Sequence, residues 1–548
     1  MTTWELRTVP PELVAEYSAA GFWTDATLGS TVDAAMEEAG GLEYRVWSAT
    51  RPYAGTVSDV YDLGRRLAAG FAARGFGPGD VIAFQLPNWM EAGAAFYGAA
   101  LLGAVIVPIV PFYGPKEVEF ILRESGARAL VSADSFGHND YATAFTAMRA
   151  RLTNLELAVF LMSDPERPLP VDAVNFDALP GPAPLDGPLP VSPDAPAVVG
   201  YTSGTTAAPK GVIHTHRTLL AEMRQVRTMG VSKGRPNITG APVGHAIGMQ
   251  GGLLIPLFLP TPIHLIDVWN PTVVLAAMLE SDATAGSGST FFLQSLLDDP
   301  TCTEEHHHHI GNVGMGGAPV PAPFADRVEG LGISLLRSYG STEHPSTTGS
   351  MQEDPREKRN HTDGRALGGV ELRLVDADGE EVGPGEPGEI LSRGPDLCMG
   401  YTDPELTATA FDDDGWYRSG DVGVLDDDGF LTITDRVKDI VIRGGENISA
   451  AEVEELMLRM DGVAEVAAVA APDRRLGEHV CAFVRMQLGA EPFDLDVVRR
   501  HLGLSGLARQ KWPEELRFVD DFPRTPTGKV KKFELRSRLR AEAGSPAS

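Results

Sequence analysis

The sequence predicts an α/β protein with a large N-terminal domain, made of two parallel-type α/β subdomains and a small β-rich subdomain, and a smaller C-terminal α+β domain. Three observations support this prediction. The chain has 548 residues, which is too long for one compact core. Short apolar runs alternate with amphipathic segments from residue 58 onward, as in a parallel sheet covered by helices on both faces. After residue 370 the pattern changes to short strands and turns.

The first α/β unit can be followed along the chain. Its first helix carries apolar residues at the helical spacing, at Val60, Leu63, Leu67 and Phe71. Strands are expected at 81–86 and 104–109. Asn88 is expected to cap the helix between them, and Pro115 to open the next one. A Pro- and Asp-rich connection at 163–196 then leads to the second half of the large domain.

The C-terminal part has the size of an independent domain, roughly 110 residues. Ser449 and Glu452 form a capping box at the start of a helix, and Gly462 suits its C-terminal end. The elements expected beyond it are strands at 463–470 and 479–486, a helix at 495–502 and a strand at 516–519.

Composition excludes several classes of partner. The formal net charge of −29 argues against nucleic acid and against an anionic membrane. No apolar run is long enough to span a bilayer and no secretory leader is present, so a cytoplasmic location without integral membrane association is expected. Three widely spaced cysteines fit a reducing compartment and form no zinc framework. The run His306–His309 is expected to be a solvated helix face rather than a metal site.

One stretch points directly to nucleotide chemistry. Tyr201-Thr-Ser-Gly-Thr-Thr-Ala-Ala-Pro-Lys-Gly-Val212 follows the apolar run 197–200 and combines four hydroxyls, two glycines and one lysine. Main-chain N–H groups, hydroxyls and an ammonium can together bind polyphosphate oxygens at a strand end. The stretch is not a Walker loop, because Pro209 and Gly211 flank Lys210.

These twelve residues resemble the phosphate-loop signature of the adenylate-forming superfamily, which includes acyl-CoA synthetases, peptide-synthetase adenylation domains and beetle luciferases. The family usually has glycine where this chain has Ala207. The resemblance implies ATP and AMP binding by Thr202, Ser203, Gly204, Thr205, Thr206 and Lys210.

Further segments match the same superfamily in the same order. Gly316-Gly-Ala-Pro319 and Ser338-Tyr-Gly-Ser-Thr-Glu343 resemble its adenine-binding segments. Within them the resemblance assigns nucleotide binding to Gly317, Ala318, Pro319, Ser338, Tyr339, Gly340, Ser341 and Thr342. Tyr339 would stack on the base, Thr342 would contact phosphate, and Glu343 would offer the hard oxygen that Mg²⁺ requires.

The ribose and acyl segments are also recognisable. Gly415-Trp-Tyr-Arg-Ser-Gly-Asp-Val-Gly423 resembles the ribose segment, with Asp421 accepting both ribose hydroxyls. Pro242-Val-Gly-His-Ala-Ile-Gly248 resembles the segment where His245 can pack beside the reacting carboxylate. An acyl pocket is expected near His245, Gly248, Gly286 and Gly288, where small residues leave room for substrate, although close packing explains such glycines equally well.

The resemblance further implies a mobile C-terminal domain. The segment 435–448 is close to the hinge signature, with Arg436 touching the nucleotide, Lys438 as the pivot, and Gly444 and Gly445 beside the pantetheine of coenzyme A. Lys529, in the segment 523–532, resembles the lysine that enters the site for adenylation. The expected division is an adenylation domain at 1–435, a hinge at 436–439 and a mobile domain at 440–548.

The resemblance implies an acyl-CoA synthetase that uses ATP, Mg²⁺ and coenzyme A to activate a small-molecule carboxylic acid. A weaker match at 86–92 and 289–297 favours a medium- or long-chain fatty acid or an alicyclic acid. The alternatives are a fatty-acyl-AMP ligase that loads a carrier protein, an aryl acid–CoA ligase, and a non-catalytic nucleotide-binding relative. The sequence leaves the acid and the oligomeric state open, although homodimers are common among enzymes of this kind.

Overall fold

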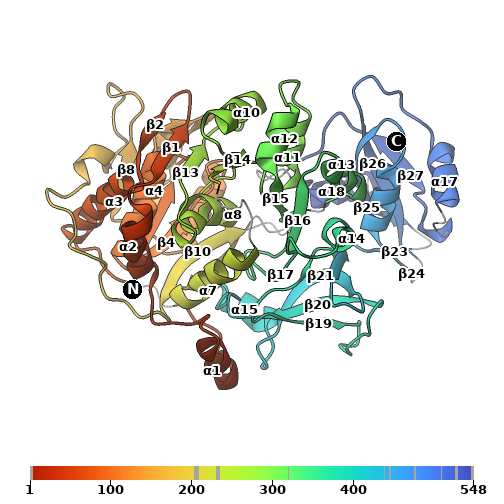
Figure 1. Ribbon diagram of the computed structural model, residues 1–548, viewed down its shortest axis with the longest axis horizontal. Helices are drawn as coiled ribbons and strands as arrows, with labels where there is room; N and C mark the ends of the chain where they lie inside the picture. The colour runs from red at the N-terminus through yellow and green to blue at the C-terminus, as the bar shows by residue number, and fades with distance from the viewer. Residues whose placement is uncertain are drawn as a thin grey trace.

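The alternating strands and helices of the N-terminal part build a seven-stranded sheet (Figure 1). In this computed structural model the described residues are 4–202, 209–229, 235–318, 320–436, 439–443, 446–473, 477–505, 507, 509–524 and 529–544. The sheet order is β11-β10-β4-β3-β5-β8-β9, and only the β10–β11 pair is antiparallel. Its strands are β3 (Val81–Gln85), β4 (Val105–Pro108), β5 (Ala129–Ala133), β8 (Leu157–Leu161), β9 (Ala173–Asn175), β10 (Pro196–Thr202) and β11 (Lys210–Thr215).

Helices cover both faces of this sheet, as the uninterrupted apolar strands predict. Ile82 and Phe84 of β3 lie in the core formed with α3 and α4, whereas Val81 and Ala83 lie in the core formed with α5 and α6. The helices are α3 (Val57–Ala72), α4 (Met90–Leu101), α5 (Pro115–Glu124), α6 (Tyr141–Met148) and α7 (His216–Val226). The hairpin β6 (Ser135–Phe136) and β7 (Asn139–Asp140) precedes α6, and α1 (Pro11–Ala19) and α2 (Leu28–Ala39) precede the sheet.

The prediction that Asn88 caps α4 is wrong. Its N-cap residue is Trp89, and no side chain caps the helix. The Asn88 side chain is instead buried and bonds to a different part of the chain, donating to the carbonyls of Ala241 and Ile266 and accepting from the N–H of Val243. A buried amide surrounded by main-chain partners satisfies more hydrogen bonds there than at an exposed cap.

A second, mostly parallel sheet brings the start of the chain beside its middle. Its order is β14-β12-β13-β1-β2, and only β1 and β2 are antiparallel. The strands are β1 (Glu43–Trp47), β2 (Tyr53–Thr56), β12 (Asn237–Thr239), β13 (Ile263–Ile266) and β14 (Thr284–Ala285). The helices of this part are α8 (Ala246–Met249), a π-helical turn (Gln250–Leu254), α9 (Ile255–Phe258), α10 (Pro271–Glu280), α11 (Thr290–Leu297) and α12 (Glu304–Ile310).

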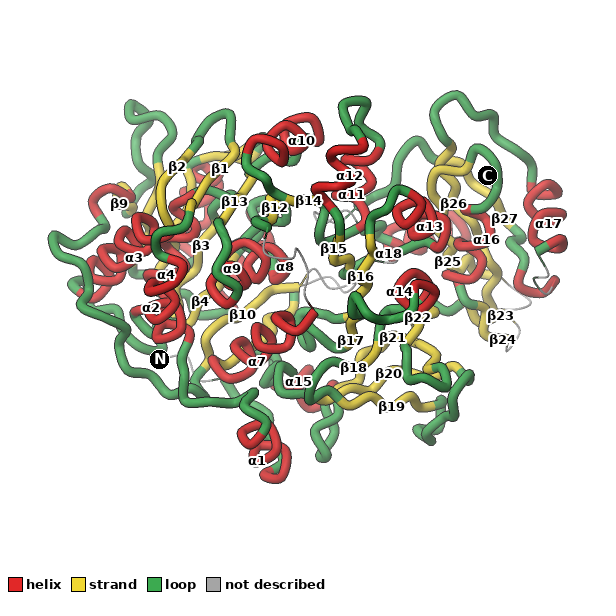
Figure 2. Tube along the Cα trace, viewed as in Figure 1, coloured by secondary structure: helices red, strands yellow, loops and turns green. Residues whose placement is uncertain are grey.

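Two smaller sheets follow. The first contains β15 (Asn312–Met315), β16 (Ser334–Tyr339), β17 (Thr348–Gly349) and β18 (Arg365–Ala366), accompanied by α13 (Ala322–Gly330) and α14 (Arg356–His361). The second is the expected β-rich subdomain, an antiparallel meander of β19 (Glu371–Val375), β20 (Pro387–Arg393), β21 (Tyr417–Leu425) and β22 (Leu431–Arg436), with α15 (Pro404–Ala410) between β20 and β21. Figure 2 shows these four strands side by side.

The C-terminal part folds around a long β25–β26 hairpin. Its sheet contains β23 (Val441–Arg443), β24 (Glu446–Ile448), β25 (Val463–Asp473), β26 (Gly477–Met486) and β27 (Glu515–Phe518). The helices α16 (Ala450–Leu458) and α17 (Leu495–Leu504) pack on one core, and α18 (Lys532–Gly544) packs on the other. The Ser449 side chain accepts the Glu452 N–H at 3.1 Å, as the capping pattern predicts.

The histidine run lies in α12, but the expectation of a solvated face is wrong for His306, which is buried and accepts the Thr303 N–H at 3.1 Å through its Nδ1. The described residues contain no group of three or more His, Cys, Asp or Glu side chains suited to a metal ion. Within the same ranges, every helix is too short or too polar to cross a membrane.

We expect acid to destabilise the protein through His216, the first residue of α7. The ring is buried and its Nδ1 accepts the main-chain N–H of Leu28 at 3.0 Å. Burial lowers the pKa of His216 to about 4. The unfolded chain binds this proton with a pKa near about 6.5, so the stability that the neutral ring contributes is complete above that pH and is lost as the pH falls toward 4. From pH 7 to pH 5 this group should lower the free energy of unfolding by about 2 kcal/mol.

Urea midpoints at the two pH values measure this effect. The matched variant is His216→Asn, whose amide oxygen can accept the Leu28 N–H but does not titrate. We expect a shallower fall in the midpoint for this variant than for the native chain. An identical pH dependence of the two proteins would contradict a neutral, buried His216.

Candidate active site

The strands that flank the predicted phosphate loop form an antiparallel hairpin. Thr202 ends β10 and pairs with Lys210, the first residue of β11. Ser203, Gly204, Thr205, Thr206 and Ala207 lie outside the described residues. Because β10 runs parallel to β4, Thr202 and Lys210 lie at the carboxyl edge of the seven-stranded sheet, where ligands bind in open α/β folds.

The turn after β16 lies against this hairpin. A Cβ atom on Gly200 of β10 would stand 3.1 Å from Cγ2 of Thr342, so the two segments are in contact. A Cβ on Gly340 would stand 1.9 Å from the carbonyl oxygen of Pro345, which explains why the turn needs glycine there. A ring nitrogen of the buried His214 hydrogen-bonds the carbonyl of Thr342 at 2.7 Å. The structure therefore brings the proposed phosphate ligands Lys210 and Thr342 to one place.

Glu343 is fixed by both its main chain and its side chain. Its carbonyl accepts the N–H of Cys398 at 2.8 Å, and its Oε1 accepts the hydroxyl of Tyr401 at 2.9 Å. The Lys210 ammonium lies over the Tyr401 ring, 5.5 Å from its centroid. Burial, and next the Glu343 charge, raise the pKa of Tyr401 well above its usual value, so the hydroxyl keeps its proton and donates it.

Asp421, the predicted ribose acceptor, lies on β21 and is buried. Its Oδ2 accepts the Tyr339 hydroxyl at 2.7 Å, and burial raises the pKa of Tyr339 well above its usual value. This hydrogen bond holds Tyr339, which was expected to stack on adenine, by its hydroxyl end. Arg436 is the ladder partner of Asp421, so the nucleotide residue expected at the hinge lies on the strand beside the ribose residue.

The other adenine segment begins at the end of β15. Gly317 has φ +75°, and a Cβ there would stand 3.0 Å from Cδ1 of Ile247. A Cβ on Gly316 would stand 2.6 Å from Oγ of Ser338, which places this segment against the start of the other one. The glycines thus allow a close approach of main chain and side chains. Ala318 is described, whereas Pro319 lies outside the described residues.

His245 and Lys529, which are far apart in the sequence, act on each other electrostatically. His245 is the N-cap residue of α8, and burial, followed by the positive charge of Lys529, lowers the pKa of His245 to about 4. The ring is therefore neutral at pH 7. A neutral imidazole beside the expected acyl pocket adds no positive charge there and leaves charge compensation to the lysines.

The glycines predicted to line the acyl pocket have different surroundings. A Cβ on Gly248 would stand 2.0 Å from the Pro242 carbonyl oxygen, and Gly286 has φ +97° with Leu293 close by. Close packing accounts for both of these glycines. Gly288 also has a positive φ but is less crowded, with Phe292 3.4 Å from the ideal Cβ position.

A cavity of ≈ 30 Å³ lies beside His245. Its lining includes Gly200, His214, Glu222, His245, Met249, Gln250 and Thr342. This places free volume between α8 and the end of β10, next to the proposed phosphate residues. A π-helical turn follows α8 directly, and such turns are common at functional sites.

The hinge can be followed only in part. Lys438, Gly444 and Gly445 lie outside the described residues. Asp439, the last residue of the expected hinge, forms an ion pair with Arg536 of α18, and the Ser449 hydroxyl donates to the Thr434 carbonyl of β22. These contacts join the C-terminal part to the end of the β meander.

Sequence reasoning missed Tyr401 and His214, and it gave Asn88 the wrong role as a helix cap. Each is buried and bonds to a main-chain or side-chain group far away in the sequence. No local spacing marks such residues. The only available signal was the polarity of Asn88 and His214 inside otherwise apolar strand ends, since buried polar groups require partners.

Comparison with known proteins places the chain in a family. The sequence model of the family described as AMP-binding enzyme matches residues 43–402. The family model described as AMP-binding enzyme C-terminal domain matches residues 452–529. The chain is 33% identical over 539 residues to a medium-chain fatty-acid–CoA ligase of Escherichia coli (strain K12), covering 96% of this chain and 92% of the relative. It is 34% identical over 495 residues to the 3-[(3aS,4S,7aS)-7a-methyl-1,5-dioxo-octahydro-1H-inden-4-yl]propanoyl:CoA ligase of Rhodococcus jostii (strain RHA1), covering 88% of this chain and 93% of the relative.

The fold agrees with this assignment. The crystal structure of ATP-bound MatB from Rhodopseudomonas palustris superposes with a TM-score of 0.83 at 27% identity, covering 94% of this chain and 99% of that one. One family model spans more than half of the chain, and its residues include the phosphate loop and the turn that carries Glu343. The chain therefore belongs to the AMP-binding enzyme family, the adenylate-forming superfamily that its motifs resemble.

Proposed function

We propose that this enzyme activates a medium- or long-chain fatty acid or an alicyclic acid. The enzyme is an ATP-dependent acid–CoA ligase, as its family and the CoA ligases among its relatives indicate. Such a ligase joins a carboxylate to AMP with release of pyrophosphate, and a thiol then displaces AMP. The substrate proposal is supported by the two relatives named for a medium-chain fatty acid and for an octahydro-indenyl propanoyl group.

One observation carries the assignment of the site residues. Lys210, the adjacent pair Thr342 and Glu343, and Asp421 come from three separate segments, which are connected through Tyr401, Tyr339 and His214. In the adenylation step the carboxylate attacks the α-phosphate, and negative charge gathers on the phosphate oxygens. Positioned cations stabilise that charge. We assign this role to Lys529 at the α-phosphate and to Lys210 at the departing pyrophosphate.

The residues present also fit a magnesium ion. The described residues hold no cluster of three acidic or histidine ligands, but Mg²⁺ in nucleotide sites uses one or two carboxylates together with substrate phosphates. Glu343 would hold the ion, which when bound neutralises part of the phosphate charge. The carboxylate is kept in place by Tyr401.

For the second step we propose a domain rotation. The adenylation domain would comprise residues 1–435, the hinge 436–439, and the mobile domain 440–548. Rotation about Lys438 would remove Lys529 and bring Gly444 and Gly445 beside the pantetheine of coenzyme A. We further propose a cytoplasmic location, since the widely spaced cysteines fit a reducing compartment.

The test is mass spectrometry of the products formed from ATP, Mg²⁺ and a pooled panel of fatty, alicyclic and aryl acids, with and without coenzyme A. We expect acyl-CoA from fatty or alicyclic acids, formed only when coenzyme A is present. Acyl-AMP that persists in excess coenzyme A would instead identify a ligase that loads a carrier protein. Preferred conversion of aryl acids would overturn the substrate proposal alone.

A further inference from the structure

We propose that Tyr401 is a positioning residue for ATP activation, because it holds the Glu343 carboxylate with its hydroxyl and carries the Lys210 ammonium on its ring. This inference rests on the proposed roles of Glu343 and Lys210. Glu343 and Lys210 are far apart in the sequence, since Glu343 follows β16 and Lys210 begins β11. One side chain that contacts both would fix their separation before the nucleotide binds.

The geometry of Tyr401 suits this role. The residue is 3% exposed, its hydroxyl is 2.9 Å from Oε1 of Glu343, and its ring centroid is 5.5 Å from Nζ of Lys210. A neutral hydroxyl that donates to a carboxylate forms a strong, short-range contact with a defined direction. The cation over the ring adds a second, weaker attraction. Loss of the hydroxyl alone should therefore affect Glu343 more than Lys210.

A second tyrosine extends the contact to the ribose strand. The Tyr417 and Tyr401 side chains are close enough for each to affect the pKa of the other. Tyr417 is the first residue of β21, the strand that also carries Asp421. The turn after β16 is thus tied to β21 by the hydrogen bond from Tyr339 to Asp421, and Tyr417 of the same strand lies near Tyr401, which holds Glu343.

The segment that carries Tyr401 is itself anchored on its inner side. It comprises residues 395–402, and we call it the bracing segment. It runs beside β11 through alternating main-chain bonds, from Met399 to Ile213, from Ile213 to Gly400 and from Thr402 to Gly211. Tyr401 is therefore in register with the strand that begins at Lys210.

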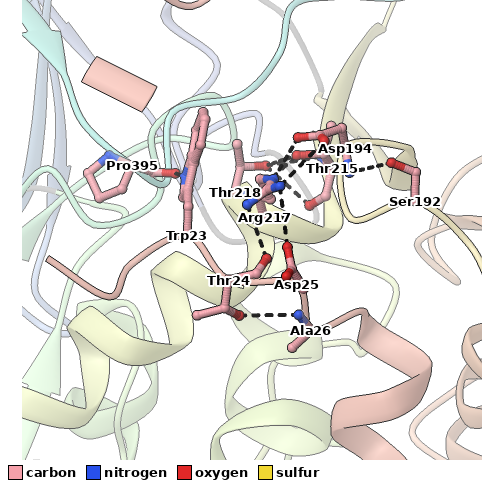
Figure 3. Close-up of polar contacts among 10 residues, drawn as sticks. All are labelled: Trp23, Thr24, Asp25, Ala26, Ser192, Asp194, Thr215, Arg217, Thr218 and Pro395. Carbon is pink, nitrogen blue, oxygen red and sulfur yellow. Dashed lines mark hydrogen bonds and ion pairs between the residues drawn. The ribbon is translucent and has the colours of Figure 1, made fainter. Parts of the chain in front are cut away.

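The N-terminal residues anchor the outer side of the bracing segment. Arg7 donates to the Cys398 carbonyl at 2.8 Å, and the indole N–H of Trp23 donates to the Pro395 carbonyl at 2.8 Å. Figure 3 shows Trp23 beside Pro395, and next to it Arg217 of α7, which pairs with Asp194 and Asp25. Hydrogen bonds thus hold both sides of the bracing segment, and they fix the main chain of Tyr401 in the position from which its side chain contacts Glu343.

The decisive variant is Tyr401→Phe, which keeps the ring under Lys210 and removes the hydroxyl. We expect about tenfold weaker binding of Mn²⁺ in the presence of ATP, measured by electron paramagnetic resonance, because removal of a partner of a metal ligand typically has an effect of this order. The rate of ATP–pyrophosphate exchange should fall at low Mg²⁺ and recover at high Mg²⁺. Conversion of supplied acyl-AMP to acyl-CoA should not change, since the metal-holding role proposed for Glu343 belongs to the step that uses ATP.

Two further variants make the test specific. Tyr141→Phe is the matched control, because that buried hydroxyl donates to the Pro111 carbonyl and hydrogen-bonds none of the site residues that the structure describes. This variant should bind Mn²⁺ and ATP like the native chain. Tyr417→Phe removes a hydroxyl near Tyr401 rather than the direct donor to Glu343, and should weaken Mn²⁺ binding by about twofold to threefold, less than loss of the direct donor. This variant remains informative if Tyr401→Phe does not fold.

The outcomes separate the inference from the function on which it rests. If Glu343→Gln abolishes Mn²⁺ binding with ATP while Tyr401→Phe and Tyr417→Phe bind as the native chain does, the role of Tyr401 is refuted and the proposed site stands. If Glu343→Gln and Lys210→Ala both bind Mn²⁺ and ATP normally, the proposed site itself is wrong, and the role of Tyr401 is refuted with it.

Discussion

Replacing Lys529 with alanine should reduce the adenylation rate about a thousandfold and leave the thioester-forming step unchanged. The loss of one positioned charge donor at a reacting oxyanion commonly costs between about a hundredfold and a thousandfold, and an ammonium that neutralises an α-phosphate belongs at the upper end. Lys529 lies close enough to His245 for its charge to contribute, after burial, to the lowered pKa of that ring. ATP–pyrophosphate exchange measures the first step, and conversion of synthetic acyl-AMP to acyl-CoA measures the second.

Lys531 provides the matched control for this variant. It lies two residues further along and forms an ion pair with Glu534 of α18 at 3.0 Å. Lys531→Ala should therefore leave both half-reactions near the native rate. A similar loss in both variants would mean that the basic segment acts through its overall charge, and a loss of both half-reactions in Lys529→Ala would refute the division of labour between the two conformations.

Replacing Asp363 with alanine should lower the free energy of unfolding by about 3–5 kcal/mol, because it leaves a buried guanidinium without its counter-ion. Asp363 Oδ1 accepts two hydrogen bonds from Arg337, at 2.6 and 3.2 Å, and its Oδ2 accepts the Ile433 N–H at 2.9 Å. The two side chains are only 9% and 12% exposed. Arg337 directly precedes Ser338, so the pair also joins the strand that leads into the adenine segment to β22.

Chemical denaturation of the native chain and the variant measures this loss. Asp298→Ala is the control, because Asp298 pairs with Arg327 at the surface, where the two side chains are 51% and 43% exposed and water screens the charges. That variant should unfold close to the native midpoint. Equal midpoints for Asp363→Ala and Asp298→Ala would show that the buried pair contributes no more than a surface pair.

Local patterns were sufficient for most of the secondary structure. The helix from Val57, the strands at 81 and 105 and the C-terminal α/β unit follow from hydrophobic periodicity, because burial on one face or on two faces imposes a repeat on neighbouring residues. The sequence could not predict which strands pair. β1 (Glu43–Trp47) pairs with β13 (Ile263–Ile266), although all strands of the seven-stranded sheet lie between them in the sequence. Hydrophobic periodicity relates neighbouring residues and does not identify a partner so distant.

The same distinction applies to the site. Resemblance of continuous segments located Lys210, Thr342, Glu343, Asp421 and Lys529, since each lies in a run whose residue types can be compared directly. The assignment of Gly248 and Gly286 to the acyl pocket stays a prediction, and the alternative explanation, close packing, also accounts for both glycines. The expected role of Asn88 as a helix cap failed because the main-chain partners that it prefers come from other segments.

By itself, the sequence determined the chemistry that the chain can bring to a nucleotide: hydroxyls, glycines and cations in fixed local runs. Only the tertiary structure decided how those runs are held relative to one another. Tyr401 is 58 residues from Glu343, and His214 is 128 residues from Thr342, yet each forms a direct hydrogen bond to its partner. A hydrogen bond requires two atoms within about 3 Å, and only the packing of the whole chain brings residues so distant in sequence to that separation.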